Sequence, residues 1–255
     1  MLDSLMAFSH VLITRPGPEA AELAQWLRGT PQKSIMMPAF RFEPGFPGLD
    51  FGRAWHSNGQ PGNRRMVIFC SPRAVEFGLR QLPAGFLDSI EIAAIGPATA
   101  NFLESAGHAV SILPAKAFNS ESLLQHPSLA SKPGQALIFS APGGRQRLFS
   151  GLKKLGWRTQ FAHVYQAVPL APSRAAVKAI LGARTILSIW TSAKSLQQLS
   201  GSIESGAWEK VLQGEFLVTS DRLGGIARRY TAGQIHVTDG PGNEAIMAGI
   251  LLLQA

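Results

Sequence analysis

Short apolar segments of this chain are followed at once by a turn and then by a helical pattern. The stretch from Ile90 to Leu124 is the clearest case. An apolar run at Ile90–Ile95 ends at Gly96-Pro97, and apolar side chains then recur at helical spacing over Ala98–Ser105. Proline just inside the first turn is typical of a helix start. Strands that alternate with helices at this spacing predict an α/β protein with parallel sheets.

The pattern is repeated in the two halves of the chain. Three strand–turn–helix units follow in the same order at an offset of roughly 120 residues, which indicates an internal duplication. The matched segments include HVLITRP with ALIFSAP, MVIFCSP with ILSIWTS, and IAAIGP with FLVTSD. The length of 255 residues also favours two domains. The proline-bounded stretch Pro127–Pro133 is typical of a linker.

The turn at Gly96-Pro97 predicts an anion-binding helix start. The backbone N–H groups of Ala98, Thr99 and Ala100 are expected to have no partner within the helix. They point beyond the end of the strand, where the helix dipole favours negative charge. Thr99 adds a hydroxyl group at the same position.

Small or hydroxyl-bearing residues stand at the other strand ends too, and arginines follow several of them. Ligands collect at the carboxyl ends of strands in open α/β sheets, so we expect these helix starts to bind carboxylates. The alternative is that the Ser and Thr side chains only cap their helices, which is their commonest role. The predicted substrate-binding residues are Thr14, Arg15, Ser71, Arg73, Gly96, Thr99, Ser140, Gly144, Arg145, Thr191, Ser192 and Ser220.

The charge balance limits the classes of partner. Lys and Arg number 24 against 16 Asp and Glu, for a net charge of +8, which indicates a polyanion or else an inert basic surface. The basic pairs lack interleaved aromatic residues, which argues against nucleic acid. The six histidines show no metal-ligand spacing, and no phosphate loop or dinucleotide fingerprint follows a strand.

The sequence also predicts where the protein is found. Its N-terminus has no signal-peptide pattern, and no apolar run approaches the length of a membrane span. Cys70 is the single cysteine, so a disulfide framework is excluded. We therefore expect a cytoplasmic protein that does not associate with membranes.

An ordered set of motifs resembles the uroporphyrinogen-III synthase family. The resemblance covers nearly the whole chain outside Gly45–Gly62. It departs from the family pattern where Cys70 replaces a usual threonine, and where Leu223 occupies the repeat position that matches Thr99. Thr99 is therefore the favoured site threonine. The motifs are TRP at 14–16, FCSPRAV at 69–75, GPATA at 96–100, NSESL at 119–123, GGR at 143–145 and VY at 164–165.

The resemblance implies a particular architecture. Two similar flavodoxin-like α/β domains, each a parallel sheet flanked by helices, are joined by a two-stranded extended hinge. Residues 1–38 and 171–255 form the first, discontinuous domain, and residues 45–163 form an inserted second domain. The hinge connectors are residues 39–44 and 164–170. A substrate would lie in the cleft between the domains.

The resemblance also implies an activity, that of a cyclising hydro-lyase in tetrapyrrole (haem or sirohaem) biosynthesis. Its substrate is hydroxymethylbilane, a linear tetrapyrrole polycarboxylate, which closes with inversion of ring D and loss of water. Tyr165 matches the family tyrosine thought to hold or protonate the leaving hydroxyl group. The alternative for Tyr165 is a hinge residue that only packs between domains. No cofactor or metal is implied. A monomer is expected, and direct transfer of the substrate from hydroxymethylbilane synthase is left open.

Two other functions remain compatible with the residues. A non-catalytic relative of the same fold would bind a tetrapyrrole or another polyanion without producing the type III isomer. A basic two-domain protein with general affinity for polyanions or nucleic acid would show steep salt dependence and little discrimination between ligands.

Overall fold

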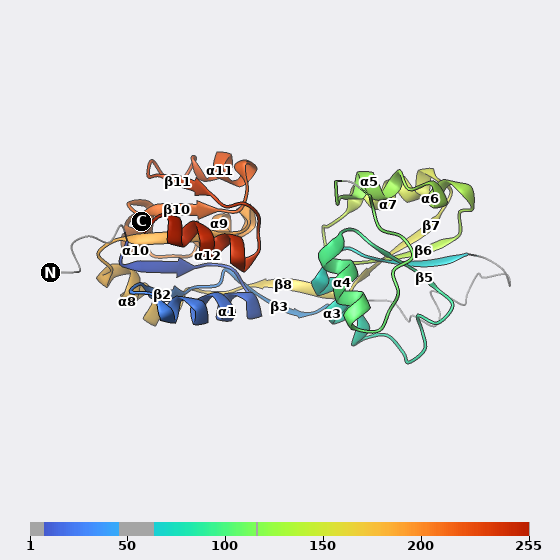
Figure 1. Cartoon of the computed structure of the whole chain (residues 1–255), viewed down its shortest axis with the longest axis horizontal. Helices are drawn as coiled ribbons and strands as arrows, with labels where there is room; N and C mark the ends of the chain where they lie inside the picture. Colours follow the sequence, from blue (N-terminus) through green and yellow to red (C-terminus); the bar gives the residue numbers. More distant parts are fainter. Residues whose placement is uncertain (1–7, 46–63, 116, 255) are drawn as a thin grey trace. The chain divides into compact units, whose positions relative to one another are not determined.

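The computed structural model describes residues 8–45, 64–115 and 117–254. Its contacts divide the chain into two compact units (Figure 1). Unit 1 comprises Met1–Phe42 and Val168–Ala255, and unit 2 comprises Glu43–Ala167. The segment 46–63, which belongs to the second domain expected from the sequence, lies outside the described residues.

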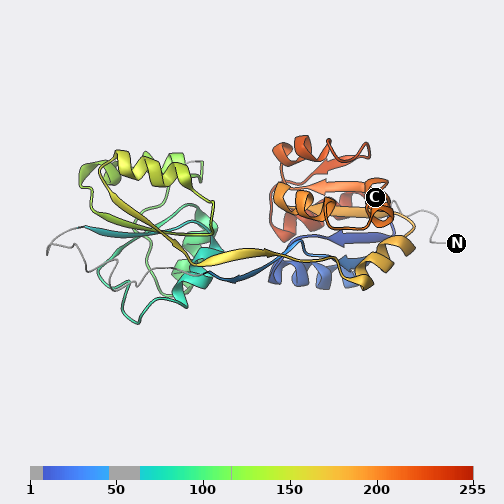
Figure 2. The same cartoon turned by 180° about the vertical axis from the view of Figure 1, so that it is seen from behind.

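Unit 1 contains a five-stranded parallel sheet in the order β11-β10-β9-β1-β2. Leu12 of β1 lies opposite Ile35 on one side and Ser188 on the other. The N-terminal segment therefore completes the sheet of the C-terminal segment, and Figure 2 shows its blue strands beside the orange ones. The strands are β1 (His10–Ile13), β2 (Lys33–Met36), β9 (Ile186–Trp190), β10 (Glu215–Val218) and β11 (Ile235–Val237).

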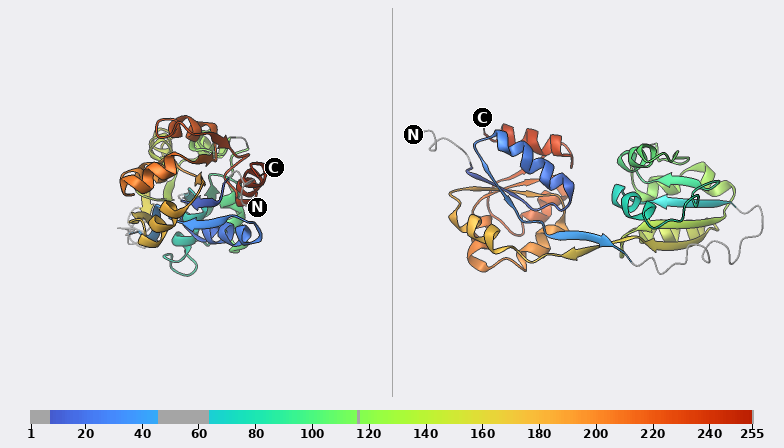
Figure 3. Two further views of the ribbon diagram at one scale, coloured as in Figure 1. Left: turned by 90° about the vertical axis from the view of Figure 1, so that its left-hand side faces the viewer. Right: turned by 90° about the horizontal axis from the view of Figure 1, so that it is seen from below.

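Helices cover both faces of the unit 1 sheet. Val11 and Ile13 pack with Leu23 of α1 and Ile246 of α12 on one face. Trp190 meets Trp208 of α10 on the other, at 6.1 Å between ring centres. The right-hand view of Figure 3 shows the blue and red helices together on one side. The helices are α1 (Pro18–Trp26), the 3-10 turn η2 (Leu27–Gly29), α8 (Arg174–Gly182), α9 (Ala193–Ser200), α10 (Ser205–Leu212), α11 (Asp221–Ala227) and α12 (Asn243–Leu252).

Unit 2 contains a four-stranded parallel sheet in the order β5-β4-β6-β7. An isolated parallel bridge from Ile112 to Ala93 continues it beyond β5. The core on one face joins Leu129 of α6 and Leu148 of α7 to Ile138 of β6. The elements are β4 (Arg65–Phe69), α3 (Pro72–Leu79), β5 (Glu91–Ala94), α4 (Pro97–Ser105), α5 (Ser120–Leu124), α6 (Pro127–Ser131), β6 (Gln135–Ser140), α7 (Gln146–Lys154) and β7 (Arg158–His163).

The two sheets have one strand order, as the duplication predicts. β5-β4-β6-β7 corresponds to β10-β9-β1-β2, and the bridge at Ile112 stands in the place of β11. Each pair of corresponding strands comes from segments that match in the sequence repeat. The predicted fold class, two similar parallel α/β sheets flanked by helices, is confirmed.

Two extended strands, β3 (Phe40–Pro44) and β8 (Tyr165–Pro169), pair with each other outside both sheets. Leu170 N donates to Ala39 O at 3.0 Å, and Gly45 N donates to Val164 O at 2.9 Å, so the strands run antiparallel. A Cβ atom at Gly45 would lie 2.0 Å from the His163 carbonyl oxygen, so this close approach requires glycine. The two-stranded connection predicted between the domains is present.

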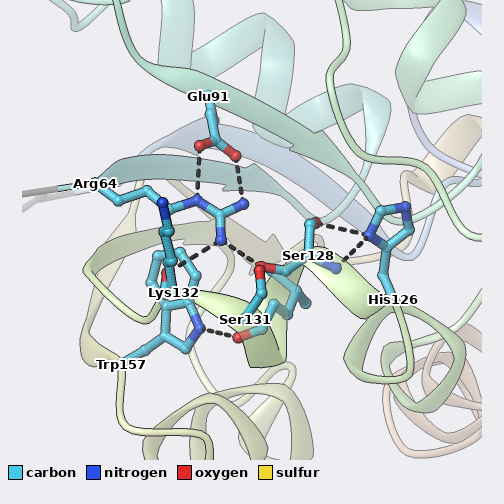
Figure 4. A network of polar contacts seen from close by, with 8 residues as sticks. Arg64, Glu91, His126, Ser128, Ser131, Lys132 and Trp157 are labelled. Atoms are coloured by element: carbon cyan, nitrogen blue, oxygen red, sulfur yellow. Dashed lines mark hydrogen bonds and ion pairs between the residues drawn. The ribbon is translucent and has the colours of Figure 1, made fainter.

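Arg64 anchors the amino-terminal edge of the unit 2 sheet (Figure 4). Its Nε and Nη2 atoms each lie 2.6 Å from a carboxylate oxygen of Glu91. Its Nη1 atom donates to the carbonyl oxygens of Ser128 and Lys132, and the guanidinium lies 5.0 Å from the centre of the Trp157 ring. The hydrogen bond to Glu91 raises the pKa of Arg64. Arg64 therefore links the start of β4 to Glu91 of β5 and to the α6 region at this edge.

The prediction of a linker at Pro127–Pro133 is wrong, and the same network explains why. Most of that stretch forms α6, because Leu129 is fully buried in the core of unit 2. Trp157 Nε1 donates to the Leu129 carbonyl oxygen at 2.8 Å. Tertiary contacts therefore stabilise a helix in a segment whose prolines, considered locally, predict a linker. Of the helices in the described part of the chain, none has the length and apolar character needed to cross a membrane.

Candidate active site

The carboxyl ends of the unit 2 strands meet at one edge of that sheet. The residues that follow β4, β5, β6 and β7 therefore lie on neighbouring strand ends. The predicted site residues that share this edge are Ser71, Arg73, Gly96, Thr99, Ser140, Gly144, Arg145 and Tyr165.

Tyr165, the predicted catalytic residue, is held against the start of α3. Its hydroxyl oxygen lies 3.3 Å from Ser71 Oγ. Ser71 Oγ also accepts a hydrogen bond of 3.1 Å from Ala74 N, so it caps α3 as well. The Tyr165 ring stacks on Phe77, with 5.8 Å between ring centres and 21° between planes. Arg73 lies half-buried in the first turn of the same helix.

Gln81 fixes the backbone beside Tyr165. Its Nε2 atom donates to the carbonyl oxygens of Val164, at 2.7 Å, and Phe77, at 2.9 Å. Phe77 and Gln81 were not among the site residues predicted from the sequence. Gln81 follows Phe77 by four residues, just beyond the end of α3, and this spacing, which places two side chains on one side of a helical turn, was the available signal.

The start of α4 differs from the prediction. Thr99 N and Ala100 N both donate to Gly96 O at 3.0 Å, so these two N–H groups have a partner within the helix. The reason is that Gly96 is the N-cap, and its extended backbone turns its carbonyl oxygen toward the first helical turn. Thr99 is buried, and a Cβ atom at Gly96 would lie 3.1 Å from Cβ of Phe118. This helix start is less open to an anion than expected.

The start of α7 combines backbone in the left-handed region with buried polar groups. Gly143 and Arg145 have φ values of 75° and 59°. Arg145 Nη2 lies 3.5 Å from the Cys70 carbonyl oxygen. Burial raises the pKa of the Cys70 thiol to about 12, opposed in part by the charge of Arg145, so this thiol is neutral at pH 7. Ser140 is buried, and its Oγ atom has no hydrogen-bond partner among the described residues.

The unit 1 residues Thr14 and Arg15 are already engaged within that unit. Thr14 is fully buried, and its hydroxyl group donates to Ile189 O at 2.5 Å. Arg15 Nη1 donates to Asn243 Oδ1 at 2.5 Å and lies 3.5 Å from Pro241 O. Both residues follow β1 at the carboxyl edge of the unit 1 sheet.

Two further serines at the same edge of unit 1 act as helix caps. Ser192 Oγ accepts a hydrogen bond from Ser195 N at 3.0 Å, and Ser220 Oγ accepts one from Leu223 N at 3.3 Å. Thr191 is half-buried immediately after β9. The capping alternative thus describes one role of Ser192 and Ser220, as it does for Ser71.

No metal site accompanies these residues in the described part of the chain. Within residues 8–45, 64–115 and 117–254, no group of three or more His, Cys, Asp or Glu side chains is arranged to hold a metal ion. Unit 1 has a cavity of about 420 Å³ beside α8, lined in part by Arg174, Val177, Lys178 and Leu181. None of the predicted site residues lines this cavity.

Comparison with known proteins gives one consistent family. Residues 22–218 match the family model described as "Uroporphyrinogen-III synthase HemD". Uroporphyrinogen-III synthase of Escherichia coli (strain K12) is 30% identical over 94% of this chain and 99% of its own length. The enzyme of the same name from Salmonella typhimurium is 29% identical over the same shares of the two chains.

Solved structures show the same fold. The uroporphyrinogen-III synthetase from Helicobacter pylori matches with a TM-score of 0.63 at 17% identity, covering 96% of this chain and 99% of that one. A mutant uroporphyrinogen III synthase from Thermus thermophilus matches with a TM-score of 0.61 at 15% identity, covering 96% and 98%.

Proposed function

The chain belongs to the uroporphyrinogen-III synthase family, and we propose that it cyclises hydroxymethylbilane to uroporphyrinogen III, with inversion of ring D and loss of water. The observation that carries the catalytic role is the position of Tyr165. Its hydroxyl oxygen lies 3.3 Å from Ser71 Oγ at a strand edge where α/β proteins bind ligands.

Tyr165 acts as the acid in the first step of this proposal. Its O–H group donates a proton to the departing hydroxyl group, which leaves as water and gives an azafulvenium cation beside the Tyr165 phenolate. Loss of the pyrrole N–H proton of this cation to water gives the neutral azafulvene. The Ser71 hydroxyl then donates a hydrogen bond to the phenolate oxygen that remains. Stacking on Phe77 and the Gln81 contacts restrict the phenol, so little reorganisation is needed during proton transfer.

The later steps depend on orientation. The substituted carbon of ring D attacks the azafulvene, and the spiro pyrrolenine that results fragments and recloses with ring D inverted. Because the bilane closes unaided to the type I isomer, the protein must favour one ring closure by holding the carboxylates of the substrate. The proposed substrate-binding residues are Thr14, Arg15, Ser71, Arg73, Gly96, Thr99, Ser140, Gly144, Arg145, Thr191, Ser192 and Ser220.

Not all of these residues offer the same groups to a substrate. The Thr14 hydroxyl already donates to Ile189 O, so Thr14 contributes through its backbone and through Arg15 beside it. Thr99 and Gly96 contribute through the helix start rather than through two free N–H groups. The proposed domains are residues 1–38 with 171–255 and residues 45–163, and the proposed hinge connectors are residues 39–44 and 164–170.

The proposal extends to the state of the protein in the cell. It works as a cytoplasmic monomer that takes its substrate from solution or directly from hydroxymethylbilane synthase. A cytoplasmic location is supported by Cys70, a buried cysteine without a disulfide partner. Sedimentation at several protein concentrations tests the monomer, and a concentration-dependent dimer mass would contradict it.

Product isomer composition tests the function. Hydroxymethylbilane is generated in situ, the protein is added at catalytic concentration, and the oxidised products are separated into uroporphyrin I and III. Predominant type III is expected. Type I alone, with protein shown to be folded by circular dichroism, would overturn catalysis and favour a relative that only binds tetrapyrroles.

A further inference from the structure

Two shielded polar atoms lie on neighbouring strands at the carboxyl edge of unit 2. Ser140 Oγ and His163 Nδ1 are closed off from solvent, and neither has a hydrogen-bond partner in the described part of the chain. Ser140 and His163 are directly opposite each other in the parallel pairing of β6 with β7. Side chains at such paired positions leave the sheet on the same face. In native proteins the large majority of buried polar atoms are paired with protein, ordered water or a ligand, so these two atoms call for a partner.

Both side chains are on the face covered by α7. Phe161, two residues before His163, stacks on Phe149 of α7 at 4.8 Å, and the His163 ring stacks on Phe161 at 5.2 Å. Ile138, two residues before Ser140, belongs to the core cluster that includes the buried leucines of α7. Since Ser140 and His163 end their strands, they lie where α7 begins.

The charges around this position favour an anion. The nine-residue helix α7 turns its first N–H groups toward the carboxyl edge, and Arg145 precedes it. Arg145 reaches the carbonyl oxygen of Cys70, whose thiol is buried and neutral. The nearest acidic group on the neighbouring helix α5, Glu121, is paired with Arg147 at 2.8 Å. Lys153, which lies 4.8 Å from the Phe149 ring, is in the last turn of α7 and does not contribute at the helix start.

We infer that Ser140, His163, Arg145 and the start of α7 form a carboxylate-binding subsite, in which His163 is an additional substrate-binding residue. The inference rests on the proposed function, under which the ligand is one carboxylate side chain of hydroxymethylbilane. Ser140 O–H, His163 Nδ1–H and the Arg145 guanidinium donate to its oxygens. A proton on His163 Nδ1 satisfies the buried nitrogen as soon as the carboxylate binds.

Binding of a small carboxylate tests the subsite without reference to catalysis. Propionate is titrated into the ¹⁵N-labelled protein, and the His163 imidazole and the first α7 amides are followed by NMR, with propionamide as the neutral control. Propionate is expected to give saturable shifts that propionamide does not give. Equal responses to the two compounds, or no response to either, would overturn the subsite.

Variants of His163 test whether its side chain contributes to the subsite. His163→Leu removes the hydrogen-bond donor and should abolish saturable propionate binding. His163→Asn keeps an N–H group near the Nδ1 position and should retain it. His108→Phe, a histidine substitution beyond the far end of α4, is the matched control and should bind propionate normally. Saturable binding by His163→Leu would remove His163 from the subsite.

Kinetics and stability complete the test. His163→Leu should raise KM for hydroxymethylbilane about ten-fold with kcat little changed, because one charge-assisted hydrogen bond to bound substrate is lost. Ser140→Ala should weaken propionate binding without lowering Tm, since among the described residues its hydroxyl group has no hydrogen-bond partner to lose. A clear fall in Tm would make Ser140 structural and contradict the inference. If the protein forms no type III product, the propionate titration still decides the subsite.

Discussion

The two sheets share one strand order, yet they differ in how their carboxyl edges use polar groups. At the edge of unit 1, the Thr14 hydroxyl donates to a strand carbonyl, and Ser192 and Ser220 cap helices. At the edge of unit 2, Ser140 and His163 keep buried polar atoms without protein partners in the described structure. The three unit 1 hydroxyl groups are thus satisfied within the protein, whereas Ser140 and His163 of unit 2 have atoms available to a ligand.

This difference distinguishes polar groups that stabilise the fold from polar groups that are available to bind a ligand. A satisfied hydroxyl group contributes to folding, whereas a buried unsatisfied one costs free energy unless a ligand pairs with it. Unit 2 offsets this cost at its opposite edge, where Arg64 is paired with Glu91 and two carbonyl groups. Substitutions at the carboxyl edge of unit 2 should thus affect function more than stability.

The largest effect is expected for Tyr165→Phe. Without the phenolic hydroxyl, the leaving group loses its acid, and kcat should fall about 100-fold while KM changes little. Steady-state formation of the type III isomer measures both constants, and thermal unfolding should be nearly unchanged. Full activity of Tyr165→Phe would leave Tyr165 as the packing residue of the alternative interpretation.

Arg64→Leu should break the opposite edge of the same sheet. It leaves the Glu91 carboxylate and two carbonyl groups without their donor, and should lower the free energy of unfolding by about 2 kcal/mol. Glu91 is 36% exposed, which keeps the loss below that of a fully buried pair. Urea denaturation followed by circular dichroism measures it.

Arg147→Ala is the matched control for Arg64→Leu. It breaks the solvent-exposed pair with Glu121 and should leave the urea midpoint unchanged. If both variants lost a comparable free energy of unfolding, the Arg64 network would stabilise unit 2 no more than a solvent-exposed ion pair does.

Ser192→Ala tests the satisfied edge of unit 1. Loss of the cap on α9 should lower the free energy of unfolding by about 1 kcal/mol, and Ser192→Thr should recover most of it. Ser140→Ala instead removes, from the carboxyl edge of unit 2, a hydroxyl group without a hydrogen-bond partner among the described residues. If both alanine variants lost the same stability, the contrast between the two edges would fail.

The smallest effect concerns Cys70. Burial raises the pKa of its thiol from 9.0 to about 12, so the folded protein should react with a thiol reagent at pH 8 only after denaturant is added. Because the unfolded thiol loses its proton first, this group contributes stability below pH 9 that is lost as the pH rises toward 12. Rapid labelling of folded protein would show that the start of α7 is open.

The sequence by itself determined the elements and their duplication. Apolar runs such as Met66–Phe69 and Ile186–Trp190 identify buried strands locally, because side-chain burial on both faces requires continuous apolar residues. Proline at the start of α3 and α4 fixes where those helices begin. The matched order of the segments predicts two sheets of one kind, whereas the pairing of β3 with β8 was expected from the family resemblance.

Only the tertiary structure decided which polar groups have partners. Ser140 and His163 are far apart in sequence and meet through strand register, which no local pattern encodes. The segment Pro127–Pro133 becomes mostly helix because Arg64 and Trp157 hold its carbonyl groups. Hydrogen bonds between distant segments depend on packing, and packing is a property of the whole unit.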